Sequence, residues 1–192
     1  MRVSRSRSVR AAASACALAF ALGAAAANVA LDELERGVLA NPADVQATAR
    51  LASAYREQGQ TRRAVDFFTR FHQAHAPNAQ SLVWQGSFKA MRASDETDIE
   101  TRLNLLQSSM ADMDRAVRLF RGDARTRAVR GISYSRFPAF LQMHAKAITD
   151  LETSLREPDG LSPGLRTAAR QGLERAYRQA GRTADADALG RP

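Results

Sequence analysis

Histidines are the first side chains in this sequence to consider for chemistry. His72 and His75 stand three residues apart, a spacing that puts both imidazoles on one face of a helix. Such a pair can supply two zinc ligands, but a zinc site needs at least one more, and His144 lies far along the chain. We therefore predict no metal site and no cofactor, and keep metal binding through His72 and His75 as an alternative.

Acidic residues are the next candidates. Asp112 and Asp114 are two apart, so on a helix their side chains do not face each other. The run 95–98 (Asp-Glu-Thr-Asp) is most simply a solvated loop that also caps a helix. Neither group has a neighbouring nucleophile or base, and no phosphate-binding loop, dinucleotide-binding glycine pattern, GxSxG or HExxH motif occurs. We predict no catalytic residues and a protein that is not an enzyme.

The first 27 residues are typical of an export signal. Four arginines without an acidic residue precede an apolar, alanine-rich stretch from 11 to about 27, and small residues precede Asn28. We expect cleavage near Ala27/Asn28 and a periplasmic protein of a Gram-negative bacterium. An uncleaved leader is the alternative, and it is the one route to a membrane that the sequence offers, although the stretch is short for a span.

Removing the leader changes the charge and the cysteine content. Without its four arginines, 24 basic residues remain against 20 acidic ones, and the net charge falls from +8 to +4. The strongly basic composition therefore overstates the case for a nucleic-acid partner, and we predict none. Cys16 is the single cysteine, so the mature chain would have no disulfide and no thiolate metal ligand.

An internal repeat determines the fold class. Residues 51–64 (LASAYREQGQTRRA) and 173–186 (LERAYRQAGRTADA) match at seven of fourteen positions, and such self-similarity indicates a repeat architecture. The pattern resembles half of a tetratricopeptide repeat, a 34-residue helix–turn–helix unit with recurring small and aromatic positions. With Tyr55 at the tyrosine position of that family, Ala52 and Ala64 fall on the small positions that let two helices approach closely. Gly59 is expected as a left-handed cap.

The same register extends through the chain. Gly86 and Gly131 take the small position of two middle units, although Lys89 replaces the tyrosine of the first. These units exceed 34 residues by 11 and 9, and the additional residues lie at 92–100, 136–144 and 156–164. The first of these segments extends one of its flanking helices, with Ser94 or Thr97 as a cap. Insertions in repeat proteins often emerge on the binding face, and neutral loop variation is the alternative.

The resemblance implies an all-α, right-handed solenoid of helical hairpins with about nine helices. No segment alternates like a strand, whereas apolar residues recur every three or four positions. The predicted helices are 29–40, 44–58, 61–75, 79–92, 98–121, 124–136, 140–156, 163–180 and 184–189. After the leader (1–27), the repeat domain (28–192) consists of a half-repeat helix at 29–40 and units at about 45–78, 79–123, 124–166 and 167–192. Most aromatic residues are assigned to the core, with Phe137 and Phe140, which flank Pro138, expected to be exposed.

The resemblance also implies where a partner binds. In this family the first helix of each unit lines a concave groove, which here would be polar, rich in arginine and almost free of acid. Arginine forks suit carboxylates, so we predict a protein or peptide partner that is acidic. The alternative is that these arginines only solubilise the surface. The predicted groove residues are Gln46, Ser53, Arg56, Gln80, Ser87, Arg125, Gln171, Arg175 and Arg178.

The resemblance therefore favours a non-enzymatic scaffold or adaptor of the bacterial cell envelope, which binds through this groove or through the inserted segments. The alternative function is a periplasmic small-molecule or metal-binding protein that uses the inserts and His72/His75.

The export prediction has a direct test. If the leader is removed as expected, N-terminal sequencing of the protein recovered from its native host will begin at or near Asn28. A sequence that begins at Met1 would remove the argument for cleavage.

Overall fold

The structure, a computed structural model, describes residues 28–157 and 159–189. Over these ranges it contains nine α-helical segments, one short 3-10 helix and no strand, which confirms the all-α prediction. The chain divides into two compact units, Met1–Gln60 and Thr61–Pro192. The predicted leader lies outside the described residues.

The first unit is a helical pair. Residues 28–40 are helical, and α2 spans Val45–Glu57. Asp44 caps α2, since its side chain accepts the Ala47 N–H at 2.9 Å. The Tyr55 hydroxyl donates to the Glu35 carboxylate and so joins α2 to the preceding helix. Gly59 follows α2 with φ of 64°, the left-handed conformation expected of a glycine cap.

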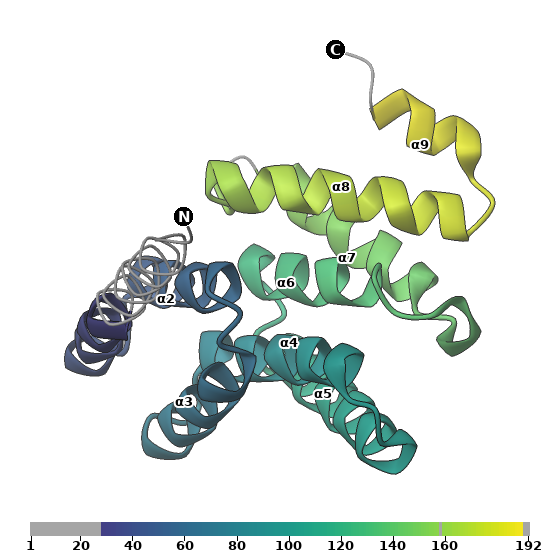
Figure 1. Cartoon of the computed structure of the whole chain (residues 1–192). Helices are drawn as coiled ribbons and strands as arrows, with labels where there is room; N and C mark the ends of the chain where they lie inside the picture. Colours follow the sequence, from purple (N-terminus) through teal and green to yellow (C-terminus); the bar gives the residue numbers. More distant parts are fainter. Residues whose placement is uncertain (1–27, 158, 190–192) are drawn as a thin grey trace, which may run out of the picture. The chain divides into compact units, whose positions relative to one another are not determined.

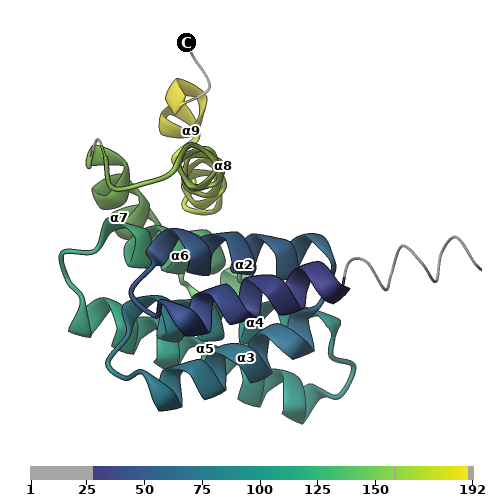
Figure 2. The same ribbon diagram turned by 90° about the vertical axis from the view of Figure 1, so that its left-hand side faces the viewer.

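The second unit is a stack of helical hairpins. The helices α4 and α5, α6 and α7, and α8 and α9 pair within hairpins, while α4, α6 and α8 lie side by side (Figure 1). In Figure 2, α8 is seen end-on with α9 beside it. The elements are α3 (Thr61–Ala74), α4 (Ala79–Asp95), α5 (Ile99–Leu119), α6 (Ala124–Tyr134), η1 (Ala139–Leu141), α7 (His144–Arg156), α8 (Pro163–Gln179) and α9 (Thr183–Leu189).

The first inserted segment lengthens α4 and prolongs α5 with it. The helix α4 continues three residues beyond its predicted end, to Asp95, and α5 begins at Ile99. The cap of α5 is Asp98, whose carboxylate accepts the Thr101 N–H at 2.7 Å, and not Ser94 or Thr97. Ser94 instead donates its hydroxyl proton to the Met91 carbonyl within α4. The hairpin therefore gains helical length instead of a long loop.

The second inserted segment shortens the predicted helix 140–156. Pro138 is followed by the 3-10 helix η1, and Gln142 then adopts φ of 53°. A non-glycine residue in this left-handed region ends the turn, so α7 begins only at His144. Segment 156–164 contains the end of α7 and Ser162, whose hydroxyl caps α8 by accepting the Leu165 N–H.

Small residues allow the hairpins to close where the register predicts them. A Cβ atom added at Gly86 would lie 2.6 Å from Met113 Cγ and 2.8 Å from the Ser109 carbonyl oxygen. The Ser109 hydroxyl donates to the Gly86 carbonyl at 2.7 Å, so α4 and α5 touch backbone to side chain. At Gly131 an added Cβ would lie 2.6 Å from Leu151 Cγ on α7. Both middle units therefore keep the close approach despite their greater length.

In three of the helical repeat units, a tyrosine hydroxyl on the first helix bonds to the helix that precedes it in the chain. Besides the Tyr55–Glu35 bond, Tyr134 on α6 donates to Asp114 on α5 at 2.7 Å, and Tyr177 on α8 donates to Glu152 on α7 at 2.7 Å. Burial, followed by the hydrogen bond to Glu152, raises the pKa of Tyr177 to about 12.

Lys89 holds the equivalent position in the unit that lacks this tyrosine. Its ammonium group bonds to Asp112 at 2.6 Å and to the Ser108 hydroxyl at 2.8 Å, both on α5 of the same hairpin. The substitution therefore redirects the contact from the preceding helix to the partner helix. Asp112 and Asp114 have different partners, which confirms that they do not face each other.

Arg130 is the centre of an ionic network across α5, α6 and α7. Its guanidinium bonds to Asp150 on α7 at 2.6 and 2.8 Å and to Asp114 on α5 at 2.9 Å. Arg127 and Lys146 add contacts to Asp150 and Asp114. Burial favours the neutral form of Asp114, but hydrogen bonds from Tyr134 and Lys146 and the charges of Lys146 and Arg130 outweigh it, so its pKa is lowered.

The aromatic prediction is confirmed with one exception. Phe67, Phe68, Phe71, Trp84 and Phe88 are buried, and Phe140 is 74% exposed as expected. Phe137 is only 5% exposed, so its predicted exposure is wrong. Its ring packs against Tyr134, with ring centroids 5.3 Å apart, because the chain turns back onto α6 before Pro138 redirects it.

Replacing Gly86 with alanine tests the close approach of α4 and α5. The added methyl would meet a backbone carbonyl that cannot rotate away, so we expect a loss of about 1–3 kcal/mol in the free energy of unfolding. The matched control is Gly37→Ala, where an added Cβ meets nothing within 4 Å and helix propensity should give a gain of about 0.5–1 kcal/mol. Urea unfolding of both variants measures the difference, and equal effects would contradict the packing argument.

Asp150→Ala tests the ionic network. Asp150 is 1% exposed, and its loss removes the carboxylate that Arg130 and Arg127 share, so we expect about 3 kcal/mol of destabilisation in the same urea assay. The control Asp185→Ala removes an exposed partner of Arg182 and should cost less than about 1 kcal/mol. A small effect of Asp150→Ala would mean that the network does not stabilise the fold.

Candidate functional site

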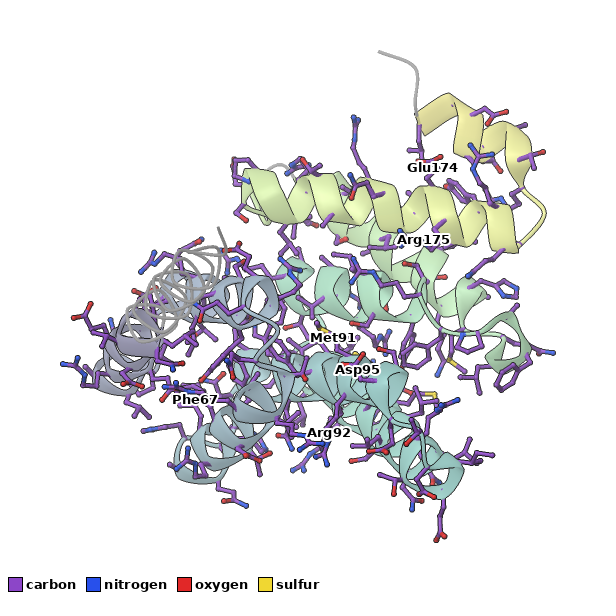
Figure 3. All side chains as sticks on the ribbon, in the orientation of Figure 1. Phe67, Met91, Arg92, Asp95, Glu174 and Arg175 are labelled. Atoms are coloured by element: carbon purple, nitrogen blue, oxygen red, sulfur yellow. The ribbon has the colours of Figure 1, made fainter. Side chains whose placement is uncertain are left out.

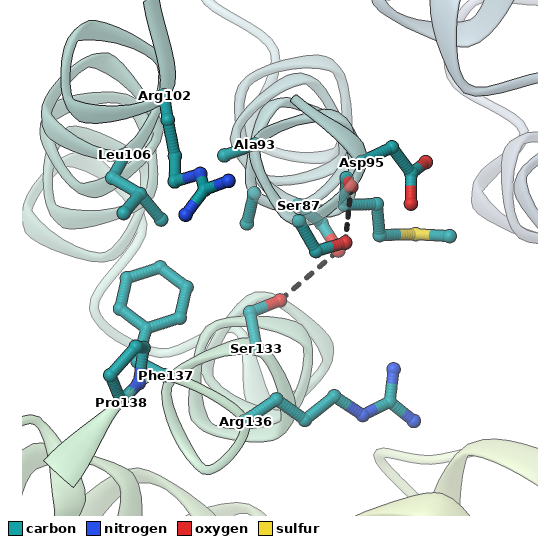
Figure 4. Close-up of a pocket in the computed structure, with 12 residues that line it drawn as sticks. Ser87, Ala93, Asp95, Arg102, Leu106, Ser133, Arg136, Phe137 and Pro138 are labelled. Atoms are coloured by element: carbon teal, nitrogen blue, oxygen red, sulfur yellow. Dashed lines mark hydrogen bonds between the residues drawn. The ribbon is translucent and has the colours of Figure 1, made fainter. Parts of the chain in front are cut away.

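Two inserted segments converge on one pocket of about 520 Å³ in the second unit. Figure 4 shows it between α4, the first half of α5 and the end of α6. Segment 92–100 contributes its α4 end and segment 136–144 contributes its first residues, although they are about 40 positions apart in the chain. The lining residues are Ser87, Ala90, Met91, Ala93, Ser94, Asp95, Arg102, Leu106, Ser133, Arg136, Phe137 and Pro138.

Helical spacing explains which α4 residues line the pocket. Met91 and Asp95 are four residues apart and therefore lie on one face of α4. Figure 3 shows both on the side of α4 that is turned toward α6, with Arg92 on the other side. The three-residue extension of α4 thus places Asp95 at the rim. The same extension supplies Ala93 and Ser94 to the lining.

The pocket has an apolar wall and a hydroxyl floor. Leu106 on α5 and Phe137 after α6 point toward each other and together form one side of the pocket (Figure 4). The hydroxyl oxygens of Ser87 and Ser133 lie 3.1 Å apart and join α4 to α6. The Ser133 hydroxyl also lies 2.9 Å from the Val129 carbonyl. These polar groups can orient a ligand through hydrogen bonds.

Arg102 supplies the positive charge that is directed into the pocket. Its Nε and Nη2 atoms donate to the Glu96 carbonyl at 2.9 and 2.5 Å, which fixes the side chain across the α4–α5 turn. Its guanidinium points toward the centre of the pocket, while the charged ends of Asp95 and Arg136 point away from it (Figure 4). Within the described residues, no carboxylate pairs with Arg102.

The predicted groove residues of the second unit lie on the first helices α4, α6 and α8. On α8, Gln171, Arg175 and Arg178 line a shallow surface depression that also contains Glu174 and Gln179. Figure 3 shows Glu174 and Arg175 on this helix. Arg178 bonds to Glu174 at 3.0 Å and to Asp187 at 3.2 Å. Acidic residues therefore lie beside the arginines of this surface, which was predicted to be almost free of acid.

The remaining groove residues lie on α2, α4 and α6. Gln80 is buried and donates to the Asp123 carboxylate at 2.9 Å, so the structure places it in the interior and not on a groove. Arg125 is half-buried on α6, and Ser87 lines the pocket. Gln46, Ser53 and Arg56 belong to α2 of the first unit, where Gln46 and Arg56 are exposed and Ser53 is half-buried.

The histidines have local partners. His72 Nδ1 lies 2.9 Å from the Ser81 hydroxyl, and burial, then the charge of Arg115, lowers its pKa. His75 packs against the Phe71 ring at a centroid distance of 5.0 Å. Among residues 28–157 and 159–189, no group of three or more His, Cys, Asp or Glu side chains is placed to hold a metal ion.

Sequence reasoning missed Arg102, Leu106 and Ser133 as site residues. Arg102 and Leu106 belong to a second helix, and the family pattern directs attention to first helices. The available signal was their i, i+4 spacing beside the inserted segment at 92–100. Ser133 lies one residue before Tyr134 and was not assigned to the groove.

The comparisons with known proteins identify the fold. Residues 47–77 match the family model described as a tetratricopeptide repeat. The structure resembles the crystal structure of TTC0263, a thermophilic TPR protein of Thermus thermophilus, at 22% identity and a TM-score of 0.63, covering 90% of this chain and 83% of that one. The chain has a tetratricopeptide-repeat-like fold.

A second solved structure supports the same assignment. The crystal structure of MamA matches at 20% identity and a TM-score of 0.50, covering 85% of this chain and 84% of that one. A comparison with curated proteins gave no match. Tetratricopeptide-like folds generally mediate protein–protein interaction, in which stacked helical hairpins present a binding surface.

No helix within the described residues is both long and apolar enough to cross a membrane.

Proposed function

We propose that this protein is a non-enzymatic adaptor of the bacterial cell envelope, and that it binds a segment of a partner protein in the pocket between α4, α5 and α6. One observation carries the proposal, namely that two separate inserted segments line this one pocket. Insertions in repeat proteins commonly lie on the binding face, and here they add walls to the surface between two first helices. The envelope location rests on the sequence of the leader.

The composition of the pocket suits binding. Its side chains offer hydroxyl groups, a guanidinium and an apolar wall, which together orient and hold a ligand. The Ser87 and Ser133 hydroxyls bond to each other and to a backbone carbonyl, not to a base that would activate them as nucleophiles. The same groups recognise a peptide through its side chains.

A small-molecule-binding protein is the second candidate function. A volume of about 520 Å³ lies within the usual range for small-molecule sites, and the pocket is built from the inserts. The adaptor function is favoured because exposed apolar residues, Ile99 and Leu103, extend beyond the pocket along α5. A surface larger than the pocket fits a polypeptide better than an enclosed small molecule.

Ala90→Trp tests whether the pocket binds the partner. Ala90 lines the pocket, so an indole at this position should obstruct it and abolish retention of a specific envelope protein in affinity capture. The matched control, Ala111→Trp, places the same side chain on an exposed position of α5 and should leave capture unchanged. Circular dichroism checks that both variants fold.

Two other results would redirect the proposal. If Ala90→Trp captures the same protein as the wild type, the pocket is not the binding site. If capture is lost instead in the double variant Arg175→Glu/Arg178→Glu, the partner binds the polar surface of α8.

A further inference from the structure

We infer that the pocket between α4, α5 and α6 recognises an acidic segment of the partner, in which a large apolar side chain enters the pocket and an adjacent carboxylate meets Arg102. The inference rests on the proposed function and adds the chemistry of the partner. It follows from three features of the site: the apolar wall, the exposed apolar surface that continues from it, and the charge of Arg102.

The pocket has space for a large side chain together with part of the segment that carries it. Leu106, Phe137 and Met91 contribute apolar surface, and the alanines at 90 and 93 leave the volume of about 520 Å³ open. A large side chain is needed to make contacts across such a space, because a small one would leave its walls without partners.

The apolar surface continues beyond the pocket along α5. Ile99 and Leu103 precede Leu106 at the helical spacing that puts all three on one side of the helix, and they are 70% and 53% exposed. Phe140, on η1 just after Pro138, is also exposed. Three of the six large apolar side chains that are exposed among the described residues therefore flank the pocket. Exposed apolar surface of this kind marks an interaction site.

The charge of Arg102 selects the group beside the apolar side chain. Arg130 and Arg178 pair with carboxylates, whereas Arg102, like Arg70 and Arg166, bonds to a backbone carbonyl. Unlike Arg70 and Arg166, Arg102 lines the pocket. Two of its nitrogens are used in that contact, and Nη1 has no acceptor among residues 28–157 and 159–189. A partner carboxylate would supply the missing countercharge through a charge-assisted hydrogen bond.

Fluorescence anisotropy with a short labelled peptide tests the inference. The probe is the peptide Gly-Glu-Phe-Glu-Gly with fluorescein at its N-terminus and an amidated C-terminus. Three comparison peptides carry Ala in place of Phe, Gln in place of both Glu, or Lys in place of both Glu. The wild-type protein should bind the Glu–Phe probe at least about tenfold more tightly than the Ala and Gln versions, and should not bind the Lys version.

Arg102→Gln identifies the group that reads the charge. It should weaken binding of the Glu–Phe probe by about tenfold and leave binding of the Gln version nearly unchanged, a double-mutant coupling between the guanidinium and the carboxylate. Arg118→Gln is the matched control, because Arg118 is an exposed arginine of the same helix outside the pocket. Equal effects of the two substitutions would overturn the assignment of Arg102.

The outcomes separate this inference from the proposed function. If Ala90→Trp abolishes capture of an envelope protein but no peptide of the series binds, the pocket is an adaptor site with a different partner chemistry, and the inference fails. If the peptides bind as expected while Ala90→Trp leaves capture unchanged, the pocket chemistry stands and the adaptor proposal fails. Equal binding of the Glu and Lys peptides would overturn the role of charge.

Discussion

The contacts of Arg130 hold the part of the structure on which the candidate site depends. Arg130 joins α6 to Asp150 on α7 and to Asp114 on α5, and Asp114 in turn accepts the Tyr134 hydroxyl. The Tyr134 ring packs against Phe137, which forms a wall of the pocket. A continuous series of contacts therefore connects a buried carboxylate to the lining of the candidate pocket. Because buried charges tolerate little displacement without a large cost, this network fixes the position of the α6 end and of the turn after it.

The local elements were predictable because each has a strong sequence signal. Tyr55, Gly59 and Ala64 recur at the same spacing 122 residues later, and a repeated helical hairpin is the fold that requires such a pattern. Gly86 and Gly131 indicated close helix contacts even in the two longer units, since no other residue permits them. The helix ends followed from capping residues and prolines, and most lie within a few residues of the prediction.

The site itself was less predictable, because it depends on where the inserted segments go. A polar run such as 92–100 is compatible with a loop or with two longer helices. The helices form here because Asp98 caps α5 and because Arg102 bonds to the Glu96 carbonyl across the turn. Phe137 looked exposed beside Pro138, yet the turn after α6 brings it onto Tyr134. Gln80 fits the groove register, but its side chain is buried and donates a hydrogen bond to the Asp123 carboxylate. Each of these outcomes depends on contacts between elements, which spacing alone does not encode.

The character of the longer α4–α5 hairpin argues against neutral variation of its connection. A segment that only tolerates insertion is expected to be polar and irregular, since nothing covers it and nothing requires it to be ordered. Here the added residues continue two helices. The turn between them is fixed by the Asp98 cap and by Nε and Nη2 of Arg102, which both donate to the Glu96 carbonyl. The extended α5 nevertheless exposes Ile99 and Leu103 instead of burying them. Exposed apolar residues on a rigid support lower the solubility of a free protein, and they become favourable only when a partner covers them. The combination of rigidity with uncovered apolar surface is what binding requires.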